Sequence, residues 1–360
     1  MILLKESEQS VIEQLSIGPL NDKSRAQDHF QLHVGDCKSV LRGFPSRSID
    51  MAMTSPPYWN QRKYGGEGIG LEETPEEYIR NILAVTEELH RVLVDEGSFW
   101  LNIGDTYYQK SLLGLPWKIA IAMMDEQGWK LRNDVIWSKL KGADNATDRL
   151  SNTHEMLFHF VKQDKYYYDS DSIRSKPRKA KVVNGAVVSA TGVSGVRYRR
   201  KIELSTELSD KEKHNALDAL DDMLSAVAHG EVSDFRMVIR GAGHRVTHSN
   251  QTRVSGRAKE LLDKGYYFLK YHPKGAKPSD VWEIIPEDSQ GRGDLHYASY
   301  PVDLCRIPIL ATCPPAGVVL DPFVGTGTTL VAAQILGRNG IGIDTVPEYV
   351  ALTQERLGHD

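Results

Sequence analysis

Ser48-Ile-Asp-Met-Ala-Met-Thr-Ser-Pro-Pro-Tyr-Trp59 is an apolar run that ends at two prolines and is followed by aromatic residues. The run from Ile49 to Met53 is short and mostly apolar, which is typical of a strand buried on both faces of a parallel sheet. Pro56 and Pro57 neither donate ladder hydrogen bonds nor continue a helix. The sequence therefore predicts a buried strand that leads into a rigid loop.

This loop offers two hydrogen-bond acceptors beside an aromatic ring. Pro57 restricts Pro56 to an extended backbone, which fixes the direction of the Pro56 carbonyl. The Ser55 hydroxyl, this carbonyl and the Tyr58 ring can together accept both N–H groups of a planar amine and stack on its face. A proline-rich turn that only closes a strand is the alternative, and the loop alone does not decide between the two.

A second stretch, residues 317–344, has the pattern of a ligand-binding turn. Residues 317–321 are expected to form a buried strand, followed by Pro322-Phe-Val-Gly-Thr-Gly-Thr-Thr329 and a helix over residues 330–336. Glycines at a strand-to-helix turn let a ligand approach the backbone closely. Residues 340–344 form a further predicted strand that ends in Asp344. This is about the twenty-residue spacing at which a carboxylate meets ribose hydroxyls.

The glycine turn departs from two common nucleotide-binding patterns. A phosphate-binding P-loop needs a lysine directly after its last glycine, and none follows Gly327. A dinucleotide fingerprint needs a third glycine, and Leu330 stands in that place. Neither a nucleoside triphosphate nor a dinucleotide is therefore the favoured ligand.

The two stretches together resemble the motifs of the amino-methylating DNA methyltransferases. Thr54-Ser55-Pro56-Pro57-Tyr58-Trp59 is similar to their catalytic motif, in which Asp, Asn or Ser precedes Pro-Pro and an aromatic residue. Asp321-Pro-Phe-Val-Gly-Thr-Gly-Thr-Thr329 is similar to their S-adenosylmethionine loop. The amine motif comes first here, which resembles the permuted β class. Asn102-Ile-Gly-Asp-Thr-Tyr107 and His154-Glu155 also resemble this class.

The resemblance implies an α/β fold: a Rossmann-like, seven-stranded S-adenosylmethionine-dependent methyltransferase fold, circularly permuted and carrying an inserted target-recognition domain. In that sheet, residues 317–321 and 340–344 would be the first two strands and residues 30–34 the third. The expected domains are an N-terminal arm (1–29), a catalytic half (30–170), a basic target-recognition insertion (171–275) and a cofactor-binding half (276–360).

Alternating predicted strands and helices support a parallel sheet. The Glu155–Tyr168 segment, with a polar Gln163-Asp164 in its middle, is predicted to be a hairpin. The other predicted strands cover residues 30–34, 98–103 and 131–137, and the predicted helices cover residues 39–44, 75–94 with Thr74 as N-cap, 115–127, 208–229 and 302–312.

Composition bounds the function further. The chain has 360 residues, a formal charge of −4 and three widely spaced cysteines, which suit a reducing cytoplasm. It has no run of about eighteen apolar residues and no apolar signal core, so neither a membrane span nor secretion is expected. His244 and His248 have one metal-like spacing but no further ligands, so no metal site is predicted. A cytoplasmic, nucleoid-associated protein of a prokaryote or phage is expected.

The insertion contains the basic clusters that would bind DNA. Nine bases and no acid stand from Arg174 to Lys201, and a second basic cluster runs from Arg236 to Lys259. A solvated face is the alternative interpretation, because charge runs commonly have no partner. The predicted DNA-binding residues are Arg174, Lys176, Arg178, Arg197, Arg199, Arg200 and Arg253.

The resemblance also assigns the site residues. Ser55, Pro56, Pro57 and Tyr58 would be catalytic, with Ser55 and the Pro56 carbonyl accepting the target amine and Tyr58 stacking on a flipped base. The expected S-adenosylmethionine contacts are the loop residues Asp321, Phe323, Gly325, Gly327 and Thr328, then Asp344 for the ribose, Asp36 for the adenine and Ser299 for the methionine carboxylate.

The predicted activity is methylation of the cytosine N4 amine at specific sites in double-stranded DNA, within a restriction-modification system. Ser55 favours cytosine, because relatives that act on adenine N6 mostly carry Asp there. Adenine-N6 methylation is the first alternative. A protein glutamine methyltransferase and a DNA-binding relative without catalysis are the others. A cognate restriction endonuclease is a candidate partner, and a monomer or dimer is expected.

Overall fold

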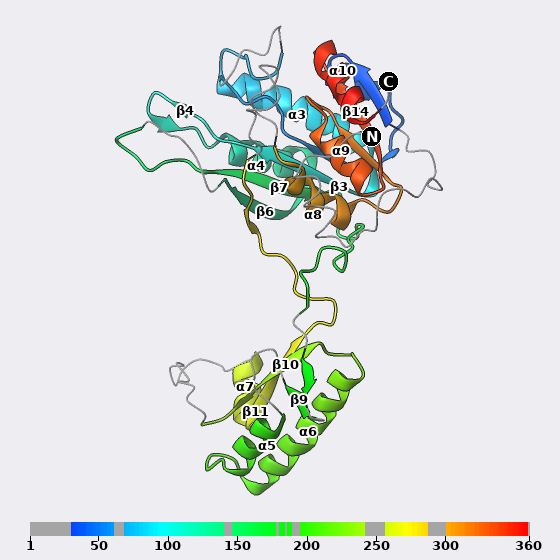
Figure 1. The fold of residues 1–360 in the computed structure, drawn as a ribbon. Helices are drawn as coiled ribbons and strands as arrows, with labels where there is room; N and C mark the ends of the chain where they lie inside the picture. The colour runs from blue at the N-terminus through cyan, green and yellow to red at the C-terminus, as the bar shows by residue number, and fades with distance from the viewer. Residues whose placement is uncertain are drawn as a thin grey trace. The chain divides into compact units, whose positions relative to one another are not determined.

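The structure, a computed structural model, describes residues 30–60, 68–139, 146–177, 180–183, 186–188, 195–241, 256–286 and 300–358. The predicted N-terminal arm lies outside these ranges. Contacts divide the chain into two units (Figure 1), one made of Met1–Ser172 and Ser279–Asp360 and the other of Ile173–Pro278. The role of the second unit in target recognition stays a prediction.

The larger unit is built on an eight-stranded sheet with the order β1-β14-β13-β2-β3-β7-β6-β12. All neighbours are parallel except β7, which runs antiparallel to both β3 and β6. The strands are β1 (Phe30–Val34), β2 (Ile49–Thr54), β3 (Leu93–Ile103), β6 (Lys130–Ser138), β7 (His154–Val161), β12 (Val281–Glu283), β13 (Val318–Asp321) and β14 (Asn339–Asp344).

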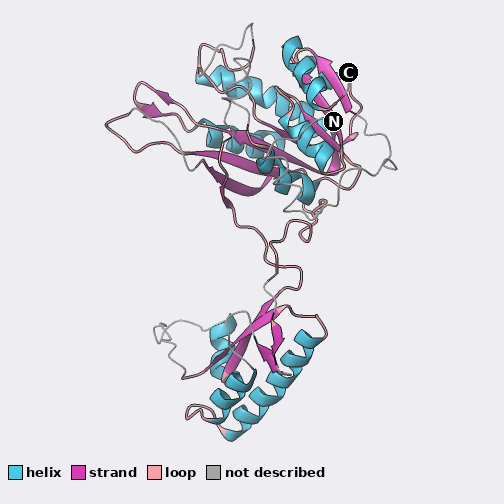
Figure 2. Cartoon of the chain, in the orientation of Figure 1, coloured by secondary structure: helices cyan, strands magenta, loops and turns pink. Residues whose placement is uncertain are grey.

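Helices cover both faces of this sheet (Figure 2). Side chains of α2, α3 and α4 pack on one face, and side chains of α8, α9 and the segment ending α10 pack on the other. The helices are α2 (Cys37–Arg42), α3 (Pro75–Val92), α4 (Leu115–Gln127), α8 (Val302–Thr312), α9 (Thr328–Ile335) and α10 (Pro347–Arg356); a small hairpin is formed by β4 (Tyr107–Tyr108) and β5 (Ser111–Leu112).

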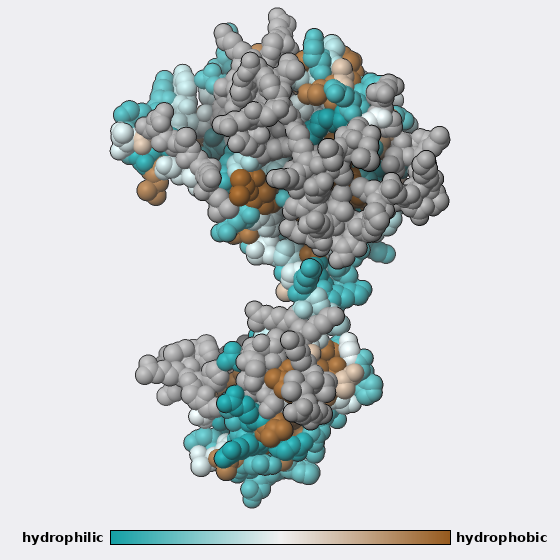
Figure 3. All heavy atoms as spheres, viewed as in Figure 1, coloured by the Kyte–Doolittle hydropathy of each residue, from teal (hydrophilic) through white to brown (hydrophobic). Residues whose placement is uncertain are grey.

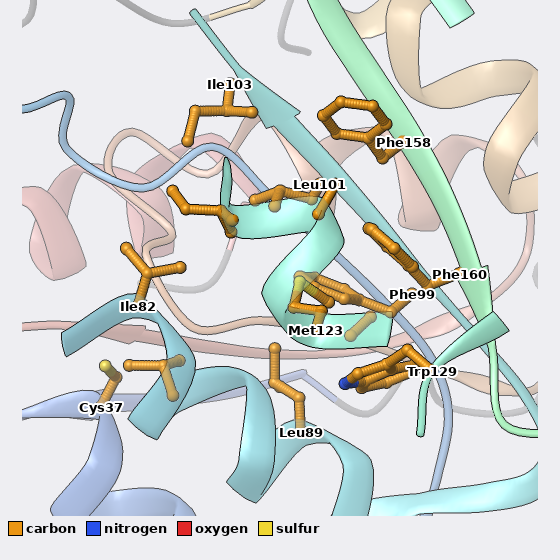
Figure 4. Packing of buried hydrophobic residues seen from close by; sticks show 14 of the residues in the cluster. Cys37, Ile82, Leu89, Phe99, Leu101, Ile103, Met123, Trp129, Phe158 and Phe160 are labelled. Carbon is orange, nitrogen blue, oxygen red and sulfur yellow. The ribbon is translucent and has the colours of Figure 1, made fainter. Parts of the chain in front are cut away.

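Side chains of the central strands point alternately to the two faces of the sheet and so contribute to the core on both sides. Met51 and Met53 of β2 join the cluster under α8 and α9, whereas Ala52 between them joins the cluster under α3 and α4. Successive side chains of a strand point to opposite faces, so one apolar run fills both layers. Figure 4 shows the second cluster, in which Phe99 and Phe160 of the sheet face Leu89 of α3 and Met123 of α4.

Local signals explain where α3 begins and ends. Thr74 accepts a hydrogen bond from the Glu77 backbone N–H at 3.2 Å, and Pro75 occupies the first turn. The predicted helix over residues 75–94 is confirmed except at its end. The helix ends at Val92, because the chain passes directly into β3 at Leu93.

The fold confirms the predicted parallel α/β architecture, with three corrections. The sheet has eight strands instead of seven, because residues 281–283 add β12 beside β6. The predicted hairpin over Glu155–Tyr168 is wrong: β7 pairs with β3 and β6, and Lys165–Tyr168 forms no strand. The helix expected at residues 39–44 begins earlier, at Cys37, because Asp36 is its N-cap.

The smaller unit has a hydrophobic core of its own. Tyr198 and Ile202 of α5, Leu220 of α6, and Phe235 and Met237 of β10 pack together in it. The acidic helix expected over residues 208–229 is confirmed as α6, which starts with a capping box between Ser209 and Glu212. The elements are β8 (Lys181–Val183), β9 (Ala186–Val188), α5 (Gly195–Glu203), α6 (Asp210–Ala228), β10 (Asp234–Ile239), α7 (Gly256–Lys264) and β11 (Tyr266–Tyr271).

Candidate active site

The two motifs meet at the carboxyl ends of neighbouring strands in the large sheet. β2 pairs with β13 in parallel, with Leu320 opposite Ala52, and β13 pairs with β14. Parallel strands end on the same side, so Ser55, Asp321 and Asp344 emerge from neighbouring carboxyl ends. Open α/β sheets bind their ligands at this edge.

Asp321 lies in a buried hydrogen-bond cluster that joins the two motifs. Its side chain is 2% exposed. The carboxylate accepts from Thr54 Oγ1 at 2.6 Å, from the Phe323 backbone N–H at 3.1 Å, and from the hydroxyls of Tyr300 and Thr329. Thr54 directly precedes Ser55, so this carboxylate connects the end of β2 to the start of the glycine turn.

Burial dominates the ionisation of this cluster. It raises the pKa of Asp321 to about 6, although the donated hydrogen bonds act in the opposite direction. The pKa of the Tyr300 phenol is also raised, first by burial and then by the nearby Asp321 charge. Tyr300 therefore stays protonated and remains able to donate.

The glycine turn and Asp344 form the adjoining part of the edge. Gly325 and Gly327 have positive φ angles of 50° and 82°, in the left-handed region that glycine adopts without strain. The Gly325 and Val346 backbone N–H groups donate to the Asp344 carboxylate at 3.0 and 2.9 Å. Burial raises the pKa of Asp344. The carboxylate thus holds the turn against the end of β14.

The Ser-Pro-Pro-Tyr loop carries a chain of polar side chains. Ser55 Oγ donates to the Tyr58 hydroxyl at 3.2 Å, and this hydroxyl donates to Glu155 Oε2 at 2.7 Å. Lys139 donates to the other oxygen of Glu155. Burial and the Glu155 charge raise the pKa of Tyr58 well above its ordinary value, so the phenol keeps its proton.

Two contacts hold this loop in place, one at its backbone and one at the Tyr58 ring. Tyr78 of α3 donates to the Pro57 carbonyl at 2.9 Å. Among the described residues, none donates to the Pro56 carbonyl. Gly104, just after β3, lies so close to Tyr58 that a Cβ there would be 2.8 Å from the ring. A larger residue at position 104 would therefore displace the ring.

Some of the predicted cofactor contacts are brought together and others are not described. Asp36 follows β1, is exposed, and accepts from the Ser39 backbone N–H at 3.0 Å. Val34 pairs with Asp344, so Asp36 and Asp344 leave neighbouring strands. Thr328 starts α9, and Phe323 stands in the turn. Ser299 lies outside the described residues.

The predicted DNA-binding residues belong to the smaller unit. Arg197 and Arg200 are exposed on α5, whereas Arg199 forms an ion pair with Asp221 of α6. Arg174 donates to the Gly275 carbonyl at 3.0 Å, and Lys176 is exposed. Arg178 and Arg253 lie outside the described residues, as do His244 and His248. Within the described ranges no cluster of histidine, cysteine and carboxylate side chains is arranged to hold a metal ion.

Sequence reasoning missed several polar partners of the two motifs. Glu155 is a single carboxylate in an apolar strand, 9% exposed, and a charge at such a position needs a partner. This lone carboxylate in an apolar run is visible in the sequence and could have indicated a polar partner. Thr329 was recognised only as the end of the glycine-turn motif, and Tyr300 and Lys139 carry no comparable signal, because only the folded sheet brings these side chains to Asp321 and Glu155.

A model of the DNA methylase family matches residues 49–355, a span that includes both motifs. The chain belongs to the DNA methylase family. This methylase is 28% identical to the type II methyltransferase M.SfiI of Streptomyces fimbriatus, over 91% of this chain and 90% of the relative. It is also 28% identical to the type II methyltransferase M.Cfr9I of Citrobacter freundii, over 91% of this chain and 87% of the relative.

Two solved structures share the fold of this methylase. The PvuII DNA methyltransferase (cytosine-N4-specific) aligns with a TM-score of 0.55 at 18% identity, covering 91% of this chain and 86% of the other. A putative DNA modification methylase from Thermus thermophilus aligns with a TM-score of 0.50 at 22% identity, covering 92% of this chain and 94% of the other. The predicted family and fold are confirmed.

S-adenosylmethionine is the methyl donor of this DNA methylase family, as predicted, and the residues at the carboxyl ends of the strands fit it. Its ribose diol needs an acceptor such as the partly exposed Asp344 carboxylate. Close approach of the cofactor to the backbone needs a turn without a side chain, as at Gly325; a Cβ at Gly327 would instead meet Thr353. None of the helices in the described part of the chain is long and apolar enough to cross a membrane.

Proposed function

We propose that this DNA methylase transfers a methyl group to the exocyclic N4 amine of a cytosine that is flipped out of duplex DNA. The observation that carries the proposal is the direction of the hydrogen bonds at Ser55. A hydroxyl has one donor and two lone pairs. Because Ser55 gives its proton to Tyr58, its lone pairs remain for an N–H donor of the substrate.

The chemistry of an aromatic amine requires such acceptors. Its nitrogen lone pair is conjugated into the ring and is a poor nucleophile. If Ser55 Oγ and the Pro56 carbonyl each accept one N–H, the nitrogen can turn toward tetrahedral geometry and direct its lone pair at the methyl carbon. The sulfonium of S-adenosylmethionine supplies an excellent leaving group. The protein therefore contributes mainly position and electrostatics.

Tyr58 would hold the face of the flipped base. Its hydroxyl bond to Glu155 and the close approach to Gly104 fix the ring before the base arrives. Base–aromatic stacking is worth about 1–3 kcal/mol. That gain is similar to the few kcal/mol that extrusion of a base costs.

Ser55 also favours cytosine over adenine, since the related adenine-N6 enzymes mostly carry Asp at this position. Adenine N6 remains the alternative base, because either amine has two N–H donors. We further propose that the protein acts in the cytoplasm, beside a cognate restriction endonuclease, within a restriction-modification system.

Transfer of labelled methyl groups tests the substrate and the base together. The protein is incubated with labelled S-adenosylmethionine, DNA and a protein extract, and the labelled DNA is digested to nucleosides for mass spectrometry. We expect label in DNA, as N4-methylcytosine. A product that contains only N6-methyladenine would contradict the assigned base, and label only in protein would contradict the assigned substrate.

Ser55→Ala tests the role of the hydroxyl. We expect it to lose most of the turnover while it still binds S-adenosylmethionine, because the lost acceptor acts mainly in the transition state. Ser48→Ala, just before the start of β2, is the matched control, since the Ser48 hydroxyl donates to the Pro45 carbonyl at 2.8 Å and not to the catalytic loop. Near-normal turnover by Ser55→Ala would exclude the proposed role.

A further inference from the structure

The β4–β5 hairpin is a small ribbon that follows the strand supporting the catalytic loop. Tyr107 pairs with Leu112, and Tyr108 pairs with Ser111. Gln109 and Lys110 form the turn, with positive φ angles of 48° and 66°. Two left-handed residues are what a tight two-residue hairpin turn requires. The ribbon projects from the larger unit in Figure 1, where β4 is labelled.

The base of the hairpin is fixed to the active site. The Asp105 carboxylate accepts backbone N–H groups from Thr106, Gly114 and Leu115, at 2.9, 2.9 and 3.1 Å, and so clamps the two ends of the ribbon together. Tyr108 packs edge-on against Trp59, with ring centroids 5.6 Å apart. Trp59 directly follows the catalytic tyrosine. The position of the ribbon is therefore coupled to that of the Ser-Pro-Pro-Tyr loop.

The ribbon and the loop beside it expose apolar side chains. Tyr107 and Leu112, which share one face, are 36% and 48% exposed, Tyr108 is 46% exposed, and nearby Leu150 is 90% exposed. In Figure 3 a small hydrophobic spot stands among hydrophilic and neutral atoms at the edge of the larger unit from which this hairpin and loop project. Exposed apolar side chains on so small a ribbon make it a candidate interaction surface.

Cations accompany these apolar side chains. The Arg149 guanidinium lies 3.8 Å from the centre of the Tyr107 ring. Lys110, at the turn, has an 88% exposed side chain and pairs with Asp148 at 3.1 Å. Surfaces that combine aromatic rings with basic side chains bind nucleic acids, because the rings stack on bases and the cations neutralise phosphates.

We propose that the β4–β5 hairpin contacts duplex DNA beside the extruded base, with Tyr107 and Leu112 against the bases next to the vacated position and Lys110 and Arg149 at the phosphates. This inference rests on the proposed function. Extrusion leaves neighbouring bases without a stacking partner, and an aromatic–aliphatic ribbon anchored to the catalytic loop is placed to cover them. The hairpin would thereby stabilise the extruded state.

Tyr107→Ala and Leu112→Ala test this contact, with Ile121→Ala as the control. Ile121 lies on α4 and is 48% exposed, as Leu112 is. Each variant is assayed on a duplex that the wild-type protein methylates, with a fluorescent cytosine analogue at the target position. We expect Tyr107→Ala to weaken DNA binding about ten-fold, the effect of losing one base stack, and to reduce the extrusion signal. S-adenosylmethionine affinity and thermal stability should remain unchanged.

Lys110→Glu tests the phosphate contact, and should reduce the slope of log affinity against log salt concentration by about one. Wild-type DNA affinity and extrusion in both hairpin variants would overturn the inference. So would a change in sedimentation coefficient without a change in DNA binding, since the face would then serve self-association. A wild-type protein that methylates no DNA would instead refute the proposed function.

Discussion

Asp321 is the residue on which the geometry of both motifs depends. It accepts hydrogen bonds from the residue before Ser55 and from the glycine turn. Sequence reasoning placed Asp321 in the cofactor loop. It did not foresee the Thr54 contact, because a separation of 267 residues leaves no pattern in one sequence. A side chain's role in such a cluster is readable only after the strands have been paired.

The Asp321 carboxyl should make stability depend on pH. Its folded pKa, raised to about 6, lies above the ordinary unfolded value, so the folded state holds the proton more tightly. The contribution is present in full below about pH 4 and is lost as the pH rises through 6. We expect the free energy of unfolding of the wild-type protein, relative to Asp321→Asn, to fall by on the order of 3 kcal/mol between pH 4 and 7.

Urea unfolding of both proteins across this range measures that difference. The comparison cancels other titrating groups, such as Asp344, which are common to both chains. A difference that stays constant with pH would show that the Asp321 carboxyl keeps its ordinary pKa in the folded protein.

At the scale of elements, α5 shows that the bases of one charged run have different surroundings in the folded protein. Tyr198 and Ile202 are buried against the rest of the smaller unit, and Arg199 is paired with Asp221. Arg197, Arg200 and Lys201 are exposed. Their exposure makes these three side chains the stronger candidates on this helix for phosphate contacts.

Charge reversal on α5 tests this division. Arg197→Glu and Arg200→Glu should each lower DNA affinity and reduce the salt slope by about one unit per lost phosphate contact. Arg199→Glu should instead affect mainly stability, by less than about 1 kcal/mol, since its ion pair is at the surface. Lys211→Glu on α6 is the control. Salt titrations of binding would contradict the division if only Arg199→Glu changed the slope.

Elements with strong local patterns were predictable, and those defined by distant partners were not. β2 was recognisable because an apolar run buried on both faces has few alternatives, and α3 because Thr74 and Pro75 mark its start. The hairpin over Glu155–Tyr168 was wrong for a physical reason: β7 satisfies its backbone by pairing with β3 and β6. β12 was missed because three residues are too few to show a period.

At the scale of the whole molecule, the two units have separate hydrophobic cores. The proposed cofactor residues all belong to the larger unit. A ligand stabilises only the unit that binds it, by about 2.7 kcal/mol at a hundred times its dissociation constant. We therefore expect calorimetry to resolve two unfolding transitions. S-adenosylmethionine should raise the midpoint temperature of only one of them, that of the larger unit.

Methionine at the same concentration is the control for that experiment, because it lacks the ribose and adenine groups that Asp344 and Asp36 are proposed to bind. A single transition that moves as a whole with S-adenosylmethionine would mean that the two units unfold together. If S-adenosylmethionine no longer raised the transition temperature of Asp344→Ala, its binding would be assigned to the site that contains Asp344.

The pairing of β2 with β13 also has a consequence for biosynthesis. Thr54 leaves the ribosome 267 residues before Asp321, an interval of roughly 13 to 53 s at bacterial and eukaryotic rates of synthesis. Throughout that time the edge of β2 that will bind Val319 and Leu320 has no strand beside it, and an open apolar edge invites aggregation. We therefore expect the nascent polypeptide to be most prone to aggregation in this interval, before translation supplies the permanent partner strand.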